Sequence, residues 1–271
     1  MTSPVEHDLS ASRSAGGELD IRGLGHSYGP NEILAGIDLT VRPGEFISLV
    51  GPSGVGKSTL LRCLSGLQRP TAGAVSYQGA PLTEPVVGVS VVFQDYSRSL
   101  LPWSSVIDNV ALPLRSAGVA KDESRARAGR ALADVGLASV DPKAYPWQLS
   151  GGMQQRVAIA RALVCEPSLV LMDEPFASVD AQTRADLEDL VRRLHAELGI
   201  SVVLVTHDMD EALYLSDRVV VLSGRPATIA TVLDVDLGPE RDQVTTKATP
   251  RFAELRGAIY HLIRPASPRS T

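Results

Sequence analysis

The segment GPSGVGKST at residues 51–59 constrains the fold of this chain more than any other feature. It matches the pattern G-x-x-x-x-G-K-S/T, with an apolar run at residues 46–50 before it and a helix-like stretch at residues 58–67 after it. In this strand–loop–helix context, backbone N–H groups and the helix N-terminus bind nucleotide phosphates, and glycines let the backbone approach them closely. The segment therefore predicts a nucleotide-binding α/β domain.

The loop supplies most of the expected nucleotide contacts. We expect Lys57 to reach the β- and γ-phosphates, and Ser58 to coordinate a Mg²⁺ ion that bridges their oxygens. The remaining predicted contacts belong to the same loop: Gly51, Pro52, Ser53, Gly54, Val55, Gly56 and Thr59.

A pair of carboxylates follows the buried run in LVLMDEP. Asp173 and Glu174 stand at the carboxyl end of a predicted strand, where ligands bind in open α/β sheets. We expect Asp173 to hold Mg²⁺ and Glu174 to act as the base that orients or deprotonates the attacking water. Taken alone, the segment also suits an acidic turn before Pro175. Lys57 upstream favours the catalytic interpretation.

Short runs rich in valine, isoleucine and leucine predict strands buried on both faces, at residues 46–50, 86–93, 169–172, 201–205 and 218–222. They alternate with helical stretches such as residues 181–198, which indicates a mainly parallel sheet covered by helices. Residues 19–21, 37–41 and 73–78 predict shorter, partly antiparallel strands. Between residues 94 and 166 the pattern becomes helical, at residues 106–117, 124–135 and 152–164. We therefore expect a helical insertion in an α/β core.

The domain boundaries follow from these patterns. We expect a disordered tail at residues 1–17 and a nucleotide-binding domain at residues 18–240, with its helical insertion at about residues 95–165. A C-terminal part at residues 241–271 contains one amphipathic helix at residues 250–263 and a frayed tail.

Composition excludes several classes of protein. The net charge of −5 gives no electrostatic footprint for nucleic acid. No apolar run approaches the roughly 18 residues expected of a membrane span, so we expect any membrane role to come through a partner. Cys63 and Cys165 are far apart and form no metal or disulfide framework, which is typical of reduced cysteines in a cytosolic protein.

The sequence contains four more motifs. Gln94 ends the run VGVSVVFQ, LSGGMQQR occupies residues 149–156, Asp180 lies in ASVDAQTR, and His207 lies in VLVTHD. Together with the loop and the carboxylate pair, they make residues 18–236 resemble the ATP-binding cassette (ABC) ATPases. The resemblance implies a P-loop NTPase core of the RecA-like type, with an antiparallel β subdomain and an inserted helical subdomain.

The resemblance also assigns roles near the phosphates. Gln94 corresponds to the glutamine that contacts Mg²⁺ or water, although a solvated amide at a strand end is the alternative. His207 corresponds to the histidine that senses the γ-phosphate. Tyr28, in HSYG, corresponds to the aromatic residue that stacks on adenine, with a plain strand tyrosine as the alternative.

The LSGGMQQR segment is similar to the signature of the family. There Ser150, Gly151 and Gly152 meet the γ-phosphate bound by the opposite subunit, which implies a head-to-tail dimer of two copies with two ATP molecules between them. Asp180 corresponds to a residue that crosses this interface. It is equally suited to cap the helix at residues 181–198.

The family's usual partner is a membrane permease, which implies a peripheral position on the cytoplasmic face of the cell membrane. We expect residues 94–110, including Trp103 and its neighbours Leu100, Leu101 and Pro102, to contribute to the permease contact. The alternative is that this apolar stretch beside a helix belongs to the core. LLPWSSVIDNV and HDMDEALYLSDRVVVLSGRPATI resemble the nitrate, sulfonate and taurine importer group, whose permeases receive a small anionic solute from an external solute-binding protein. The stretch between Gln94 and Pro102 is longer than in the usual sulfonate or taurine pattern, which leaves the substrate open.

Two other functions are compatible with some of these motifs. A soluble ABC ATPase acting on ribosomes or DNA would show two cassettes, a long coiled coil or basic arms, and none appears here. A regulatory subunit without turnover would have lost Lys57, Asp173, Glu174 or His207. All four are present.

Overall fold

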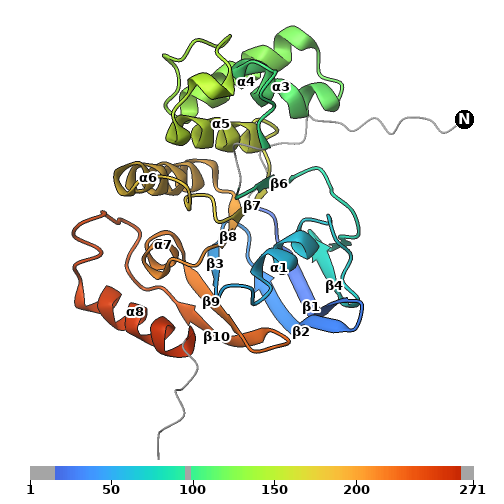
Figure 1. Cartoon of the computed structure of the whole chain (residues 1–271), viewed down its shortest axis with the longest axis vertical. Helices are drawn as coiled ribbons and strands as arrows, with labels where there is room; N and C mark the ends of the chain where they lie inside the picture. The colour runs from blue at the N-terminus through green and yellow to red at the C-terminus, as the bar shows by residue number, and fades with distance from the viewer. Residues whose placement is uncertain (1–15, 95–98, 264–271) are drawn as a thin grey trace, which may run out of the picture.

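A computed structural model describes residues 16–94 and 99–263 of the chain (Figure 1). Its centre is a six-stranded sheet in the order β10-β9-β3-β8-β7-β6. The strands are β3 (Phe46–Val50), β6 (Val89–Val92), β7 (Leu169–Asp173), β8 (Ser201–Val205), β9 (Arg218–Ser223) and β10 (Thr228–Asp234). All adjacent pairs are parallel except β10 on β9. This confirms the mainly parallel α/β fold predicted from the sequence.

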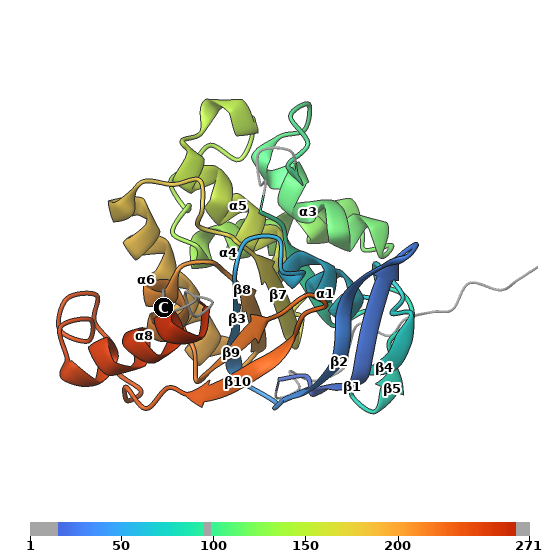
Figure 2. The same ribbon diagram turned by 60° about the horizontal axis from the view of Figure 1, so that its bottom comes forward.

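A second, antiparallel sheet covers one face of the central sheet together with α1 (Lys57–Leu64) (Figure 2). Its order is β2-β1-β4-β5, formed by β1 (Leu19–Tyr28), β2 (Asn31–Val41), β4 (Ala72–Tyr77) and β5 (Ala80–Pro81). Strand β1 is longer than the predicted run at residues 19–21. Arg22 and Gly23 break the apolar alternation there, and irregularities in the β1–β2 register after Ile21 let the strand continue.

Helices cover the other face. The helices α5 (Gly151–Leu163) and α6 (Ala181–Leu198) pack against the strands, and α3 (Val106–Ser116) and α4 (Lys121–Asp134) pack on α5 as a further layer (Figure 1). The short 3-10 helix η1 (Pro146–Gln148) precedes α5. Strand β3 shows why both faces are apolar, because Phe46 joins the core under the helices while Ile47 and Leu49 join the core under the second sheet.

The structure also corrects the sequence expectations for β6, α7 (Met209–Leu215) and β10 (Thr228–Asp234). The strand predicted at residues 86–93 is only β6, because Pro85 precedes this stretch and Gly88 has a left-handed φ of 95°. The helix α7 was not predicted, since its seven residues span only two turns. The edge strand β10 was also missed, because exposed and half-buried residues alternate along it and no continuous apolar run marks it.

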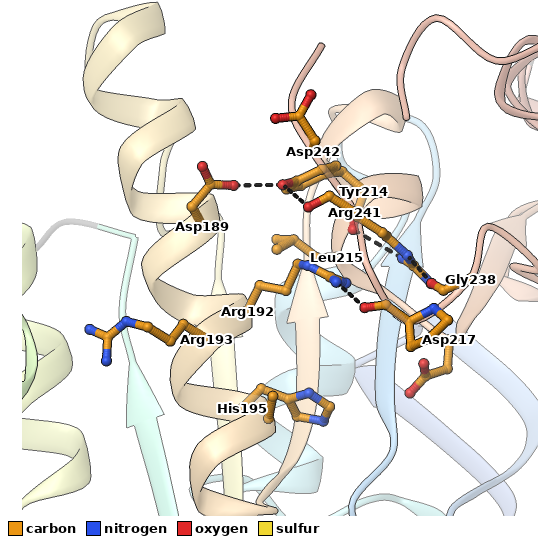
Figure 3. Close-up of a pocket in the computed structure, with 12 residues that line it drawn as sticks. Asp189, Arg192, Arg193, His195, Tyr214, Leu215, Asp217, Gly238, Arg241 and Asp242 are labelled. Atoms are coloured by element: carbon orange, nitrogen blue, oxygen red, sulfur yellow. Dashed lines mark hydrogen bonds between the residues drawn. The ribbon is translucent and has the colours of Figure 1, made fainter. Parts of the chain in front are cut away.

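The C-terminal residues pack closely on the central sheet and α7. Figure 3 shows the Tyr214 hydroxyl donating to Asp189 Oδ1 at 2.6 Å, beside Arg241. Arg241 Nη1 donates to the carbonyl oxygens of Leu213, Tyr214 and Ser216 at 2.9–3.0 Å, which satisfies the C-terminal end of α7. The helix α8 (Pro250–Ile263) has the predicted bounds and buries Phe252, Leu255 and Ile259.

Gly16 and Gly17 are already hydrogen-bonded to the rest of the fold, although the sequence predicts that the domain starts at Glu18. Gly16 N–H donates to Gly199 O at 3.0 Å, and Gly17 N–H donates to Ser168 O at 2.9 Å. The rest of the predicted N-terminal tail, residues 1–15, and the predicted C-terminal tail at residues 264–271 lie outside the described residues.

Candidate nucleotide site

Four neighbouring strands carry the predicted catalytic and metal-binding residues to one edge of the central sheet. Strand β3 leads into the loop at residues 51–56, β6 is followed by Gln94, β7 ends at Asp173 with Glu174 next, and His207 follows β8 after one residue. Because these strands are parallel, their carboxyl ends lie at the same edge, which is the usual place for ligands in such sheets.

The glycine-rich loop has the backbone that a phosphate site requires. Gly54 and Gly56 have left-handed φ angles of 73° and 113°, and a Cβ at Gly56 would lie 2.9 Å from Ile33 Cγ2. Lys57 is buried, and its Nζ donates to Gly51 O at 2.8 Å and to Pro52 O at 3.3 Å. The ammonium group has three donors, so one N–H remains for another acceptor.

The electrostatic setting of Lys57 depends on opposing effects. Burial lowers the pKa of Lys57, whereas the nearby carboxylates of Glu174 and Asp173 raise it. Without these two acids, burial would act unopposed on the ammonium group. The two acids at the end of β7 therefore support the charge that phosphate binding needs.

Ser58 and Asp173 meet at the start of α1. The Ser58 hydroxyl donates to Asp173 Oδ1 at 3.1 Å. Burial raises the pKa of Asp173, and the hydrogen bond from Ser58 opposes that rise. A hydroxyl and a carboxylate are oxygen donors of the type that Mg²⁺ prefers. In residues 16–94 and 99–263 there is no group of three or more His, Cys, Asp or Glu side chains that could hold a metal ion.

The side chain of Glu174, which follows β7, contacts one residue that follows β6 and one that follows β8. Its Oε2 lies 3.0 Å from His207 Nδ1 and accepts a hydrogen bond from Gln94 Nε2 at 3.4 Å. The backbone of Glu174 has a left-handed φ of 42°, and its N–H donates to Val205 O at 2.8 Å. Non-glycine residues in this conformation concentrate at functional sites. The structure thus brings Gln94, Glu174 and His207 together.

A surface pocket connects this cluster with Tyr28. It is lined by Tyr28, Ile33, Ser53, Gly54, Gly56, Lys57, Ser58, Thr59 and Glu174. The Tyr28 side chain is 44% exposed, its hydroxyl donates to Gln68 Oε1 at 2.8 Å, and its ring meets His26 edge-on at 4.7 Å. Ile33 was missed by sequence reasoning, because nothing in its pattern separates it from any other strand residue.

The signature residues lie elsewhere. Ser150 caps α5, accepting a hydrogen bond from Met153 N–H at 3.3 Å, and Asp180 caps α6, accepting one from Thr183 N–H at 3.0 Å. None of Ser150, Gly151, Gly152 or Asp180 lines the pocket beside the chain's own glycine-rich loop. Asp180 therefore caps α6, which is the second of the two roles that the sequence allows for it. Asp180 is also exposed, so a second copy of the chain could reach it.

A G-x-x-x-x-G-K-S/T loop between a strand and a helix, with an acidic residue at the end of a neighbouring strand of a mainly parallel sheet, is typical of the P-loop NTPases. The family model described as "ABC transporter" matches residues 34–177 of this chain. The chain belongs to the ABC transporter family.

Several curated relatives are similar over most of this chain. The aliphatic sulfonates import ATP-binding protein SsuB 1 of Xanthomonas axonopodis pv. citri is 46% identical over 92% of this chain and 98% of its own length. The taurine import ATP-binding protein TauB of Chromobacterium violaceum is 48% identical over 74% of this chain and 76% of its own. The nitrate import ATP-binding protein NrtC of Synechococcus elongatus is 44% identical over 85% of this chain, which spans only 35% of that longer protein.

Solved structures show the same fold. The dimeric ATP-binding cassette MJ0796, in a post-hydrolysis state bound to ADP and Pi, has a TM-score of 0.71 and 31% identity, covering 80% of this chain and 98% of its own. The structure of cbiO1 from Clostridium perfringens, part of the ABC transporter complex cbiONQ, has a TM-score of 0.72 and 28% identity, covering 80% and 88% of the two chains. No helix in the described part of this chain is both long and apolar enough to cross a membrane.

Proposed function

We propose that this chain is the ATP-hydrolysing subunit of an importer whose membrane permease is a separate polypeptide. The observation that carries the proposal is the position of Glu174, whose carboxylate lies 3.0 Å from His207 Nδ1 and within 3.4 Å of Gln94 Nε2. A base placed between two such groups, beside a phosphate loop, is suited to activate water for attack on a γ-phosphate.

The side chains divide the work of hydrolysis. The loop N–H groups and the remaining donor of Lys57 would hold the phosphates, and the Tyr28 ring, which lines the same pocket, would contact the adenine. Ser58 and Asp173 would hold Mg²⁺, with Gln94 as a further ligand, and the ion would supply positive charge that offsets the charge of the phosphates. Glu174 accepts the proton of the attacking water, and His207 orients the Glu174 carboxylate.

The active unit is a head-to-tail pair of chains. One chain supplies its phosphate loop, and the other supplies Ser150, Gly151 and Gly152 at the N-terminus of α5, whose N–H groups have no partner within the helix. This accounts for the absence of the signature residues from the chain's own pocket, and the dimeric state of the MJ0796 cassette supports it.

The permease contact includes the loop between β6 and α3. Trp103 is 75% exposed there, whereas Leu100, three residues earlier, is buried in the core. Asn109 fixes this loop, because its Oδ1 accepts from Leu101 N–H at 2.7 Å and its Nδ2 donates to Leu101 O and Ser104 O. The exposed indole is therefore presented on a rigid turn. Residues 95–98, part of the same predicted contact, lie outside the described residues.

The transported solute is a small anion of the nitrate, sulfonate or taurine type, delivered by an external solute-binding protein. The names of relatives at 44–48% identity support this choice. The chain works on the cytoplasmic face of the membrane and contacts the permease, not the solute. Neither the site nor the relatives favour a ribosome or DNA as the partner.

Glu174→Gln tests the catalytic assignment. The amide keeps the shape of the side chain but cannot accept a proton, so the variant should bind ATP normally and lose steady-state phosphate release. Glu197→Gln, on the exposed side of α6, is the matched control and should hydrolyse at the normal rate. Normal hydrolysis by Glu174→Gln would refute the assignment.

Transport is tested by reconstitution. The chain should co-purify with a membrane permease, and solute-loaded binding protein should stimulate its ATPase activity in proteoliposomes. Growth of a deletion strain on single nitrogen and sulfur sources would identify the solute. Stimulation by ribosomes or DNA, without a permease, would contradict the transport function.

A further inference from the structure

Thr183 lies between two motifs that are far apart in the sequence. It belongs to the first turn of α6, and Gly152 belongs to the first turn of α5. A Cβ added to Gly152 would lie 2.4 Å from Thr183 Cγ2, closer than real Cβ contacts allow. On its other side, Thr183 donates to Asp180 twice, from Oγ1 to Oδ2 at 2.7 Å and from N–H to Oδ1 at 3.0 Å.

Thr183 is held in this position. A β-branched side chain has few χ1 rotamers in a helix, and rotation of the methyl away from Gly152 would break the hydroxyl bond to Asp180. Gly152 is not among the glycines with a left-handed φ, so its backbone conformation does not require glycine. The packing of Thr183 gives a steric reason for glycine at this position.

We propose that Thr183 is a positioning residue that locks the signature end of α5 to the Asp180 turn, so that both present to a second chain as one rigid surface. The inference rests on the two-chain site proposed above. It adds that the signature is aligned from within its own chain, through a methyl group on one side of Thr183 and a hydroxyl on the other.

Two conservative substitutions separate the contribution of the Thr183 methyl group from that of its hydroxyl group. Thr183→Ser keeps the hydroxyl and removes the methyl, and Thr183→Val does the reverse. Without Cγ2, the nearest atoms of residue 183 to a Cβ at Gly152 are Cβ at 3.7 Å and the hydroxyl oxygen at 3.8 Å, which are ordinary contacts. Gly152→Ala should therefore fit when it is combined with Thr183→Ser. It should clash with the native Thr183 and when it is combined with Thr183→Val.

The experiment measures association of Glu174→Gln chains in ATP and Mg²⁺ by analytical ultracentrifugation. Gly152→Ala should weaken association by about tenfold or more, as expected for an overpacked contact. Adding Thr183→Ser should restore it to within about threefold of Thr183→Ser alone, a difference below 1 kcal/mol, whereas adding Thr183→Val should not. Thr183→Ser alone should leave the affinity of each separate chain for ATP equal to that of the Glu174→Gln parent, because Thr183 does not line the pocket at the chain's own phosphate loop.

Gly129→Ala is the matched control, because Gly129 also lies in a helix but a Cβ there would meet nothing within 4 Å. Thermal unfolding without nucleotide should show a lowered midpoint for Gly152→Ala and recovery with Thr183→Ser. If the Gly152→Ala/Thr183→Ser chain associates as weakly as Gly152→Ala, the role of Thr183 is refuted while the two-chain site stands. If the Glu174→Gln parent does not associate, both fail together.

Discussion

The buried acid Glu211 makes a quantitative prediction about stability. It lies in the first turn of α7, four residues after His207, and only 4% of its surface is exposed. Burial raises the pKa of Glu211 from 4.5 to about 8, and the charges of Glu188 and Asp208 add to the rise. The hydroxyl of Thr206 and the guanidinium of Arg184 act in the opposite direction.

A raised pKa means that the folded protein keeps a proton that the unfolded chain has lost. The free energy of unfolding should therefore fall as the pH rises above 4.5, until the folded group ionises near pH 8. Each pH unit in this range costs about 1.4 kcal/mol. Between pH 6 and pH 9, the titration of Glu211 should therefore lower the free energy of unfolding by about 3 kcal/mol.

Glu211→Gln removes this titration while keeping the size of the side chain. Urea unfolding at pH 6 and pH 9 should show a pH-dependent loss that is about 3 kcal/mol smaller in Glu211→Gln than in the wild type. Titrating groups that do not interact with Glu211 cancel in the comparison. Glu197→Gln, exposed on α6, should retain the wild-type pH dependence. Parallel pH dependences of the wild type and Glu211→Gln would refute the reasoning.

Three further substitutions test the site and the core. Lys57→Ala should weaken ATP binding by about tenfold or more, since a charge-assisted bond to phosphate is lost; unchanged affinity in calorimetry, with exposed Lys121→Ala as the control, would contradict this. His207→Ala should lower kcat by about a hundredfold while the affinity for ATP stays constant, and a normal kcat would remove His207 from catalysis. Leu204→Ala, at a fully buried position in β8, should reduce the free energy of unfolding by about 2–5 kcal/mol. Leu198→Ala, at a side chain 42% exposed, should change it by less than about 1 kcal/mol.

The sequence predicts those parts of the fold that depend on neighbouring residues. The loop at residues 51–59 is local, and strands such as β3 and β8 are apolar throughout because both faces of the sheet are covered. Strand β10 lies at the sheet edge with one face half exposed, and α7 depends on a two-turn segment capped by Asp208. Both were missed, because tertiary contacts rather than a strong local pattern stabilise them.

The sequence predicts which residues could form the candidate site, but it does not predict the contacts between their side chains. The motifs of Gln94, Glu174 and His207 follow three different strands, and only the strand order of the folded sheet brings their side chains together. The contact of Thr183 with Gly152 has no sequence signal, because it depends on how two helices cross. The local sequence pattern does not specify how side chains from distant segments pack against each other.

The central claim is that two chains share each ATP between a phosphate loop and a signature. Light scattering of Glu174→Gln in ATP and Mg²⁺ tests it most directly, because binding without hydrolysis should hold the closed pair together. We predict that the mass doubles from the 28.8 kDa of one chain and returns to it when ATP is replaced by ADP. A variant that binds ATP with wild-type affinity and keeps the mass of a single chain would contradict the account.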